Sequence, residues 1–117
     1  MSLVLIIDDD AQFRTMVRRL LEAEGHSVIE AENGNEGIEK FRSQSPDMIV
    51  TDMIMPERSG IETIMQIREE SPTMRIVAVS GGDMAGDMLG SAMSVGANEV
   101  LAKPFRGEDL LRAIDRR

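Results

Sequence analysis

The sequence predicts an α/β domain with a parallel sheet and helices on both faces. Short apolar runs rich in Val, Ile and Leu recur along the chain, and such runs are typical of strands buried on both faces. Between these runs, apolar residues recur every three or four positions, as they do on one face of a helix. The two patterns alternate five times with short connections. Five successive βα units joined by right-handed crossovers form a parallel sheet.

The first unit combines a strongly apolar run with an amphipathic helix. A strand is expected at residues 3–7, and the helix begins after Asp10. Gly25 ends this helix, because glycine adopts the left-handed conformation of a helix C-terminus without steric cost. The apolar face of the helix is formed by Phe13, Met16, Val17, Leu20 and Leu21.

The second and third units are bounded by prolines. A strand at residues 28–31 precedes a short helix at residues 35–42. Pro46 stops that helix, because the residue before a proline disfavours the helical conformation. The third strand, at residues 48–51, is again strongly apolar, and the helix after it ends before Pro72.

Glycines distinguish the fourth unit from the others. Its strand, at residues 76–80, leads into residues 81–96, where five glycines interrupt a helical spacing of apolar residues. Each interior glycine costs about 1 kcal/mol relative to alanine, so this helix is expected to be the weakest. A strand at residues 100–102, the Lys103-Pro104 pair and an amphipathic helix form the fifth unit.

Composition limits the classes of function that are open to the protein. Its 117 residues are expected to form one domain, residues 1–117. The net charge of −8 argues against binding of nucleic acid, which requires an excess of Lys and Arg. The absence of cysteine excludes disulfides and Cys-ligated zinc, and fits a reducing compartment. No stretch approaches the ~20 apolar residues of a membrane span, so we expect a cytoplasmic protein that binds no membrane.

Acidic residues follow two of the most apolar strands. Asp8 and Asp9 come directly after the first strand, and Asp52 comes directly after the third. The carboxyl ends of parallel strands meet at one edge of the sheet, where ligands bind in folds of this class. Two carboxylates about 4 Å apart repel each other by about 4 kcal/mol, so three together require a cation. The candidate ligands at these strand ends are all oxygen atoms, so the expected cation is a hard one such as Mg²⁺.

Each polar residue at the strand ends also has a simpler interpretation. Asp10 is expected to cap the first helix, and Asp8 and Asp9 could be solvated loop residues. Ser80 could cap the fourth helix, and Lys103 could be an ordinary surface lysine. Their common place at the strand ends favours a shared site instead. There the hydroxyl would suit a phosphoryl oxygen, and the ammonium would bind the carboxylates or a phosphoryl group.

Four short motifs stand in order along the chain. They are Asp8-Asp9, Asp52 followed by Met55-Pro56, Ser80 followed by a small residue, and Lys103-Pro104-Phe105. In this order and spacing they resemble the receiver domain of two-component response regulators, and the resemblance spans the whole chain. It implies a flavodoxin-like (βα)5 fold, with a five-stranded parallel sheet of order 2-1-3-4-5 and helices on both faces.

The resemblance also implies a phosphorylation site. Asp52 would accept a phosphoryl group from a sensor histidine kinase or phosphotransfer protein. Asp9, Asp52 and the backbone carbonyl of Ile54 would hold Mg²⁺, and Asp8 would act mainly through a bound water. Such a domain is a signalling switch rather than an enzyme, although it assists its own phosphorylation and dephosphorylation.

Signal relay and signal lifetime are also implied, with two departures from the family pattern. Ser80 and Lys103 would contact the phosphoryl oxygens, and movement at Ser80 and the fourth helix would relay the signal. The family often has an aromatic residue three positions before the lysine, where this chain has Val100. In the family, the residues two positions after the phosphoacceptor and two positions after the Ser/Thr can orient the water that hydrolyses the phosphoryl group. In this chain these residues are Ile54 and Gly82, which have no side-chain group that can hydrogen-bond a water. Slow loss of the phosphoryl group is therefore expected.

Two other functions are alternatives. A haloacid-dehalogenase-like phosphatase would use Asp8 and Asp10 with Ser80 and Lys103, but Asp52 would then have no role. A receiver that binds protein partners without being phosphorylated would need only the fold. The sequence leaves open the kinase, the downstream partner, the output and the oligomeric state, and whether the domain is part of a longer protein.

Overall fold

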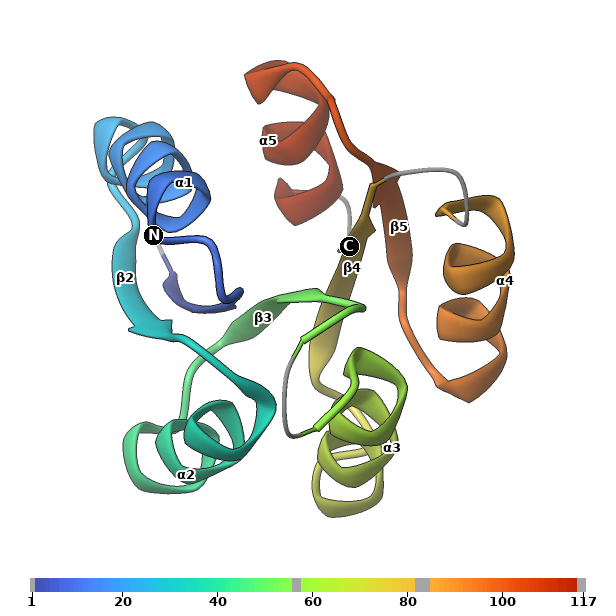
Figure 1. Ribbon diagram of the computed structural model, residues 1–117. Helices are drawn as coiled ribbons and strands as arrows, with labels where there is room; N and C mark the ends of the chain where they lie inside the picture. The colour runs from blue at the N-terminus through green and yellow to red at the C-terminus, as the bar shows by residue number, and fades with distance from the viewer. Residues whose placement is uncertain (1, 56–57, 82–84, 116–117) are drawn as a thin grey trace.

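The computed structural model describes residues 2–55, 58–81 and 85–115, which form one sheet between two layers of helices (Figure 1). Within these residues, five parallel strands lie in the order β2-β1-β3-β4-β5, which confirms the expected flavodoxin-like topology. The strands are β1 (Leu3–Ile7), β2 (Ser27–Ala31), β3 (Met48–Asp52), β4 (Arg75–Ser80) and β5 (Glu99–Ala102). The helices are α1 (Ala11–Ala23), α2 (Gly34–Gln44), α3 (Gly60–Glu70), α4 (Ala85–Val95) and α5 (Gly107–Asp115). None of the helices described is long and apolar enough to cross a membrane.

The sheet separates two apolar cores. Helices α1 and α5 cover one face, and α2, α3 and α4 cover the other (Figure 1). Successive residues of a strand point to opposite faces. Strand β1 therefore places Val4 and Ile6 in the core under α1 and α5, and Leu5 and Ile7 in the other core. This burial on both faces explains why β1 is apolar throughout instead of alternating.

Helix α2 is longer than expected from the sequence. It runs from Gly34 to Gln44 rather than over residues 35–42. Asn33 caps its first turn, because its side chain accepts the N–H of Glu36 at 2.8 Å. At the other end, Ser45 has a φ of 48° and takes the left-handed conformation that is usually filled by glycine.

The register of the strands brings their carboxyl ends to one edge of the sheet. Ile7 of β1 lies opposite Thr51 of β3, and Asp52 lies opposite Val79 of β4. Ser80 in turn lies opposite Ala102 of β5. The residues that follow these strands are therefore neighbours in space, although up to 95 positions separate them in the sequence.

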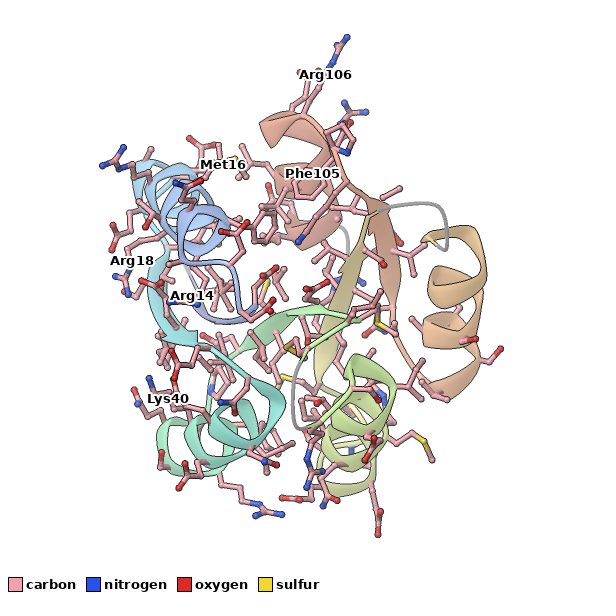
Figure 2. The ribbon with its side chains drawn as sticks, in the orientation of Figure 1. Arg14, Met16, Arg18, Lys40, Phe105 and Arg106 are labelled. Carbon is pink, nitrogen blue, oxygen red and sulfur yellow. The ribbon has the colours of Figure 1, made fainter. Side chains whose placement is uncertain are left out.

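Basic side chains gather around the edge strand β2. Arg14 and Arg18 extend from α1, and Lys40 extends from α2 (Figure 2). Arg18 Nη2 donates a hydrogen bond to the carbonyl of Val28 at 3.2 Å, and Lys40 Nζ donates to the carbonyl of Glu30 at 2.5 Å. Because an edge strand has backbone groups without a strand partner, these cations satisfy carbonyls of β2 that the sheet leaves open.

Candidate functional site

Three carboxylates converge at the carboxyl edge of the sheet, as the sequence predicts. Asp8, Asp9 and Asp52 each present one oxygen, and these oxygens all lie within 4.8 Å of one another. Asp8 and Asp52 are buried, with 1% and 8% of their surface exposed, whereas Asp9 is exposed. Buried carboxylates repel each other strongly when no cation lies between them. The cluster therefore has the chemistry of a site for a hard divalent cation.

Lys103 supplies positive charge beside two of these carboxylates. Its Nζ donates a hydrogen bond to Asp8 Oδ2 at 3.0 Å and lies 4.0 Å from Asp52 Oδ1. The other Asp8 oxygen accepts the backbone N–H of Asp10 at 2.9 Å. The Lys103 side chain is partly buried, with 26% of its surface exposed, and it pairs with a buried carboxylate, unlike an ordinary surface lysine.

The Asp52 carboxyl has a raised pKa of about 6, against 3.8 for an ordinary aspartate. Burial is the main cause, and the negative charge of Asp8 adds to it. Lys103 and the backbone N–H groups of Met53 and Ile54 act in the opposite direction, and the Met53 N–H donates to Asp52 Oδ1 at 2.8 Å. Asp52 is thus ionised at neutral pH in a place that disfavours its charge.

Ser80 is the last residue of β4 and is completely buried. Its backbone carbonyl accepts the N–H of Lys103 at 2.7 Å, which ties the ends of β4 and β5 together. Its hydroxyl Oγ has no hydrogen-bond partner among the described residues. Buried hydroxyls without a partner are rare and costly, so Oγ is available to a ligand. Ser80 belongs to strand β4, and its Oγ accepts no N–H group of the described part of α4, so the described residues give no support to the alternative role of Ser80 as a helix cap.

Asp10 has the structural role expected of it. Its Oδ1 accepts the N–H groups of Gln12 and Phe13 at 2.9 and 3.3 Å, which caps the first turn of α1. The phosphatase alternative requires Asp10 to share the chemistry with Asp8. Because the Asp10 side chain is engaged by the helix, that alternative loses one of its acids.

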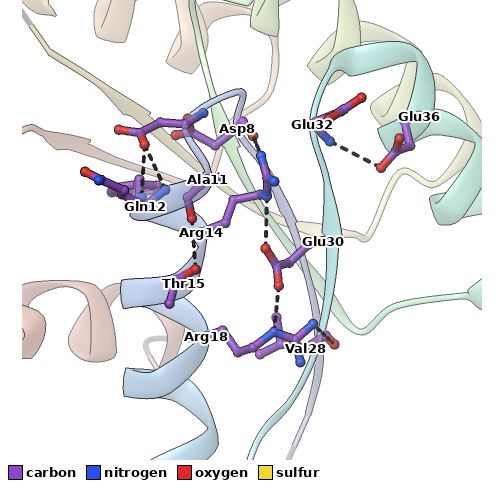
Figure 3. A network of polar contacts seen from close by, with 12 residues as sticks. Asp8, Ala11, Gln12, Arg14, Thr15, Arg18, Val28, Glu30, Glu32 and Glu36 are labelled. Carbon is purple, nitrogen blue, oxygen red and sulfur yellow. Dashed lines mark hydrogen bonds and ion pairs between the residues drawn. The ribbon is translucent and has the colours of Figure 1, made fainter.

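A network of polar contacts on the α1 side supports the Asp8 loop from below (Figure 3). Arg14 Nη1 donates to the carbonyl of Asp8 at 2.6 Å, and Arg14 Nε donates to Glu30 Oε1 at 2.9 Å. The other oxygen of Glu30 accepts from Arg18 Nε at 2.7 Å. Sequence reasoning missed Arg14 and Glu30, because only the packing of α1 on β2 shows that they meet. In the sequence, the only indication of this contact is that a basic residue, Arg14, follows Asp10 by four positions, one helical turn into α1.

Of the other residues singled out in the sequence, Ile54 and Val100 lie in the described part of the chain. Ile54 follows the cluster with its side chain 56% exposed, and its carbonyl is still only a predicted metal ligand. Val100, in the place where the family often has an aromatic residue, is half-buried against the core under α2, α3 and α4. Pro56 and Gly82 lie outside the described residues. The loop after Ser80 is therefore described only as far as Gly81.

Comparison with known proteins agrees with this geometry. Residues 4–115 match the family model described as the response regulator receiver domain. The chemotaxis protein CheY of Bacillus subtilis is 35% identical over 114 residues, which cover 97% of this chain and 94% of CheY. The nitrate/nitrite response regulator NarL of Escherichia coli is 40% identical over 113 residues, which cover 95% of this chain but 52% of NarL.

A solved structure supports the same family. The crystal structure of a response regulator receiver domain protein from Clostridium thermocellum matches with a TM-score of 0.91 and 34% sequence identity. The match covers 97% of this chain and 91% of that one. Sequence, family model and three-dimensional structure therefore agree over nearly the whole chain. This protein belongs to the response regulator receiver domain family of two-component signalling.

Proposed function

We propose that residues 1–117 act as one phosphoacceptor domain, in which Asp52 accepts a phosphoryl group in a Mg²⁺-dependent reaction. The observation that carries the proposal is the meeting of three carboxylates within 4.8 Å of one another, with the Lys103 ammonium beside them. Such a cluster has little structural value, because buried like charges destabilise a fold. Its composition suits the binding of a cation and a phosphoryl group.

The donor set fits Mg²⁺. Asp9 and Asp52 offer carboxylate oxygens as direct ligands, the backbone carbonyl of Ile54 would be a third oxygen ligand, and Asp8 would act mainly through a bound water. Ligands at about 2.1 Å from Mg²⁺ lie about 3–4 Å apart. The oxygens of the three carboxylates lie within 4.8 Å of one another, so small shifts would bring them to that spacing. Exposed Asp9 leaves one side of the cluster open to water, which Mg²⁺ tends to retain. When bound, the ion would neutralise negative charge that collects during phosphoryl transfer.

The residues of the chain would divide the work of transfer. A carboxylate oxygen of Asp52 attacks phosphorus as the bond between phosphorus and the donor breaks. The ion pair with Lys103 places a positive charge beside that oxygen, and the free Ser80 Oγ offers a hydrogen bond to a phosphoryl oxygen. Phosphoryl transfer depends mainly on such positioning and charge stabilisation.

The donor would be a sensor histidine kinase or a histidine phosphotransfer protein, as the family membership suggests. The phosphorylated domain would then act as a switch through the Ser80 loop and α4, and it would bind no nucleic acid itself. The chain spans about half the length of NarL but nearly all of CheY, so the output is a separate question.

Mass spectrometry tests the proposal. Incubation with acetyl phosphate and Mg²⁺ should add one phosphoryl group, and EDTA should prevent the addition. Asp52→Asn should abolish labelling. Asp10→Asn is the matched control, because asparagine caps helices as well as aspartate, and labelling should persist. Labelling that survives in Asp52→Asn, or that needs no divalent cation, would contradict the proposal.

A further inference from the structure

One aromatic ring lies against the Lys103 ammonium, and a second ring packs against the first. Lys103 Nζ lies 4.1 Å from the centroid of the Phe13 ring. Phe13 in turn meets Phe105 edge to face, with ring centroids 6.0 Å apart and ring planes at 88°. Phe105 and Met16 extend toward the space between α1 and the start of α5 (Figure 2). Together with Phe13, Lys103 and Pro104 they line a small, mostly apolar cavity.

We propose that Phe13 is a positioning residue that holds the Lys103 ammonium at the phosphoacceptor site. This inference rests on the proposed function, in which Lys103 serves the phosphoryl group. A lysine carries its charge on a flexible four-carbon stem, so its backbone position alone does not place the ammonium. The negative face of an aromatic ring attracts a cation that lies within about 6 Å of its centroid. The measured distance of 4.1 Å is well inside that range.

The ring is itself held in place from two directions. Its edge-to-face contact with Phe105 fixes the tilt of the ring, because such contacts have a preferred geometry. The backbone N–H of Phe13 donates to the Asp10 cap, so the ring projects from the ordered first turn of α1. The loop that carries Asp8 therefore leads directly into the turn that carries the ring. A carboxylate and an aromatic face that contact the same ammonium are thus fixed by one short segment.

Phe13 differs from the other partners of Lys103 in one respect. Asp8 and Asp52 contact the ammonium through carboxylates, and both carboxylates belong to the proposed metal site, Asp52 as a direct ligand and Asp8 mainly through a bound water. Their availability to Lys103 would change when the cation binds and when Asp52 is phosphorylated. The Phe13 ring takes part in neither event. It is the contact that persists and keeps the ammonium within reach of the incoming phosphoryl group.

The small number of lysines makes the contact directly measurable. The chain has two lysines, Lys40 and Lys103, so protein labelled with ¹³C-lysine gives two sets of side-chain NMR signals. In the protein without metal, the Lys103 ε-methylene protons should lie upfield of those of Lys40, because an aromatic ring face shields nearby protons. Phe13→Leu should remove this shift, and Phe13→Tyr should retain it. Phe13→Met, which also lacks a ring, serves if the leucine variant does not fold.

A matched control separates positioning from general packing. Phe41→Leu makes the same chemical change in the core on the other face of the sheet. It should lower stability but leave the Lys103 signals in place. In parallel, phosphorylation by acetyl phosphate with Mg²⁺ should slow by about two- to fivefold in Phe13→Leu, the factor expected for loss of one cation–π contact. Phe13→Tyr should restore the rate, and Phe41→Leu should not change it.

The two measurements distinguish failure of this inference from failure of the proposed function. Unchanged Lys103 signals in a folded Phe13→Leu variant would overturn the positioning role. So would a shifted signal with an unchanged phosphorylation rate. If the unmodified protein took up no phosphoryl group, the proposed function would fall and the role of Phe13 in transfer would fall with it. The NMR comparison would still decide whether the ring holds the ammonium.

Discussion

At the scale of single residues, the site combines a charge that the fold disfavours with groups that are ready to compensate it. Asp52 is buried next to Asp8, and Lys103 compensates the two charges only in part. The Ser80 hydroxyl has no hydrogen-bond partner among the described residues. Both features cost stability in the absence of a ligand. Binding of a cation and then of a phosphoryl group would relieve them.

The first prediction concerns the pH dependence of stability. The folded state raises the Asp52 pKa from 3.8 to about 6, so folding favours the protonated form. The associated cost is absent below about pH 4 and complete above about pH 6, where it amounts to about 3 kcal/mol. Without Mg²⁺, Asp52→Asn should therefore stabilise the protein more at about pH 7.5 than at about pH 5, by on the order of 1 kcal/mol.

Urea unfolding followed by circular dichroism, in EDTA, measures this difference. Asp115→Asn removes an exposed carboxylate at the end of α5 and is the matched control. If Asp52→Asn were destabilising at neutral pH, the burial cost assigned to the carboxylate would be wrong.

The second prediction concerns the lifetime of the phosphoryl group. Ile54 lies two residues after Asp52 and is 56% exposed, yet its side chain cannot hydrogen-bond an attacking water. Ile54→Asn should therefore speed the loss of phosphate severalfold after the donor is removed, as followed by mass spectrometry. Met65→Asn, a similar change at another exposed apolar residue, should leave the decay unchanged. If the unmodified protein, Ile54→Asn and Met65→Asn lost the phosphoryl group at the same rate, the side chain at position 54 would not control access or orientation of the attacking water.

At the scale of secondary-structure elements, helix α1 does more than cover the sheet. Its cap fixes the acidic loop, Phe13 contacts Lys103, and Arg14 donates to the carbonyl of Asp8. Glu30 of β2 accepts a hydrogen bond from Arg14 and holds it in place. Burial alone would raise the pKa of the Glu30 carboxyl, but its hydrogen bonds with Arg18 and Arg14 hold that pKa below its ordinary value. The position of the Asp8 loop thus depends on the packing of α1 against β2.

The third prediction tests that support. Arg14→Lys keeps the charge but cannot donate to Asp8 and Glu30 with the same fork of N–H groups. It should weaken Mg²⁺ binding by about tenfold, as loss of an outer hydrogen bond commonly does at metal sites. Isothermal titration with MgCl₂ measures the affinity. Arg19→Lys, on the exposed part of the same helix, is the control. Equal affinities in the two variants would show that the Arg14 contact does not support the site.

The elements differ in how well the sequence predicts them. Strand β1 is apolar throughout, and β3 and β4 each contain a run of three or four buried apolar residues, so burial on both faces leaves few other interpretations. Helix α2 was predicted too short, because the caps at Asn33 and Ser45 depend on local backbone conformation that a hydrophobic pattern does not contain. The acidic cluster was predictable because strand ends meet at one edge. The contacts of Lys103 with Phe13 and of Arg14 with Asp8 were not, because they depend on how α1 packs.

At the scale of the whole molecule, the acidic cluster lies at the carboxyl edge of a sheet that two layers of helices cover. The chain has a net charge of −8, and three of its acids are concentrated at that edge. A divalent cation that binds there should stabilise the folded state, because it binds the native cluster and not the unfolded chain. The fold thus concentrates negative charge at an edge where a bound cation would balance it.

Among all these acids, Asp52 is the one that we propose receives the phosphoryl group. Reduction of the phosphorylated protein with borohydride converts an acyl phosphate of aspartate to homoserine, and peptide mass spectrometry then locates the modified residue. We predict homoserine at position 52 alone, only after treatment with acetyl phosphate and Mg²⁺. Homoserine at position 8 or 9, or no conversion at position 52, would contradict this account of the site.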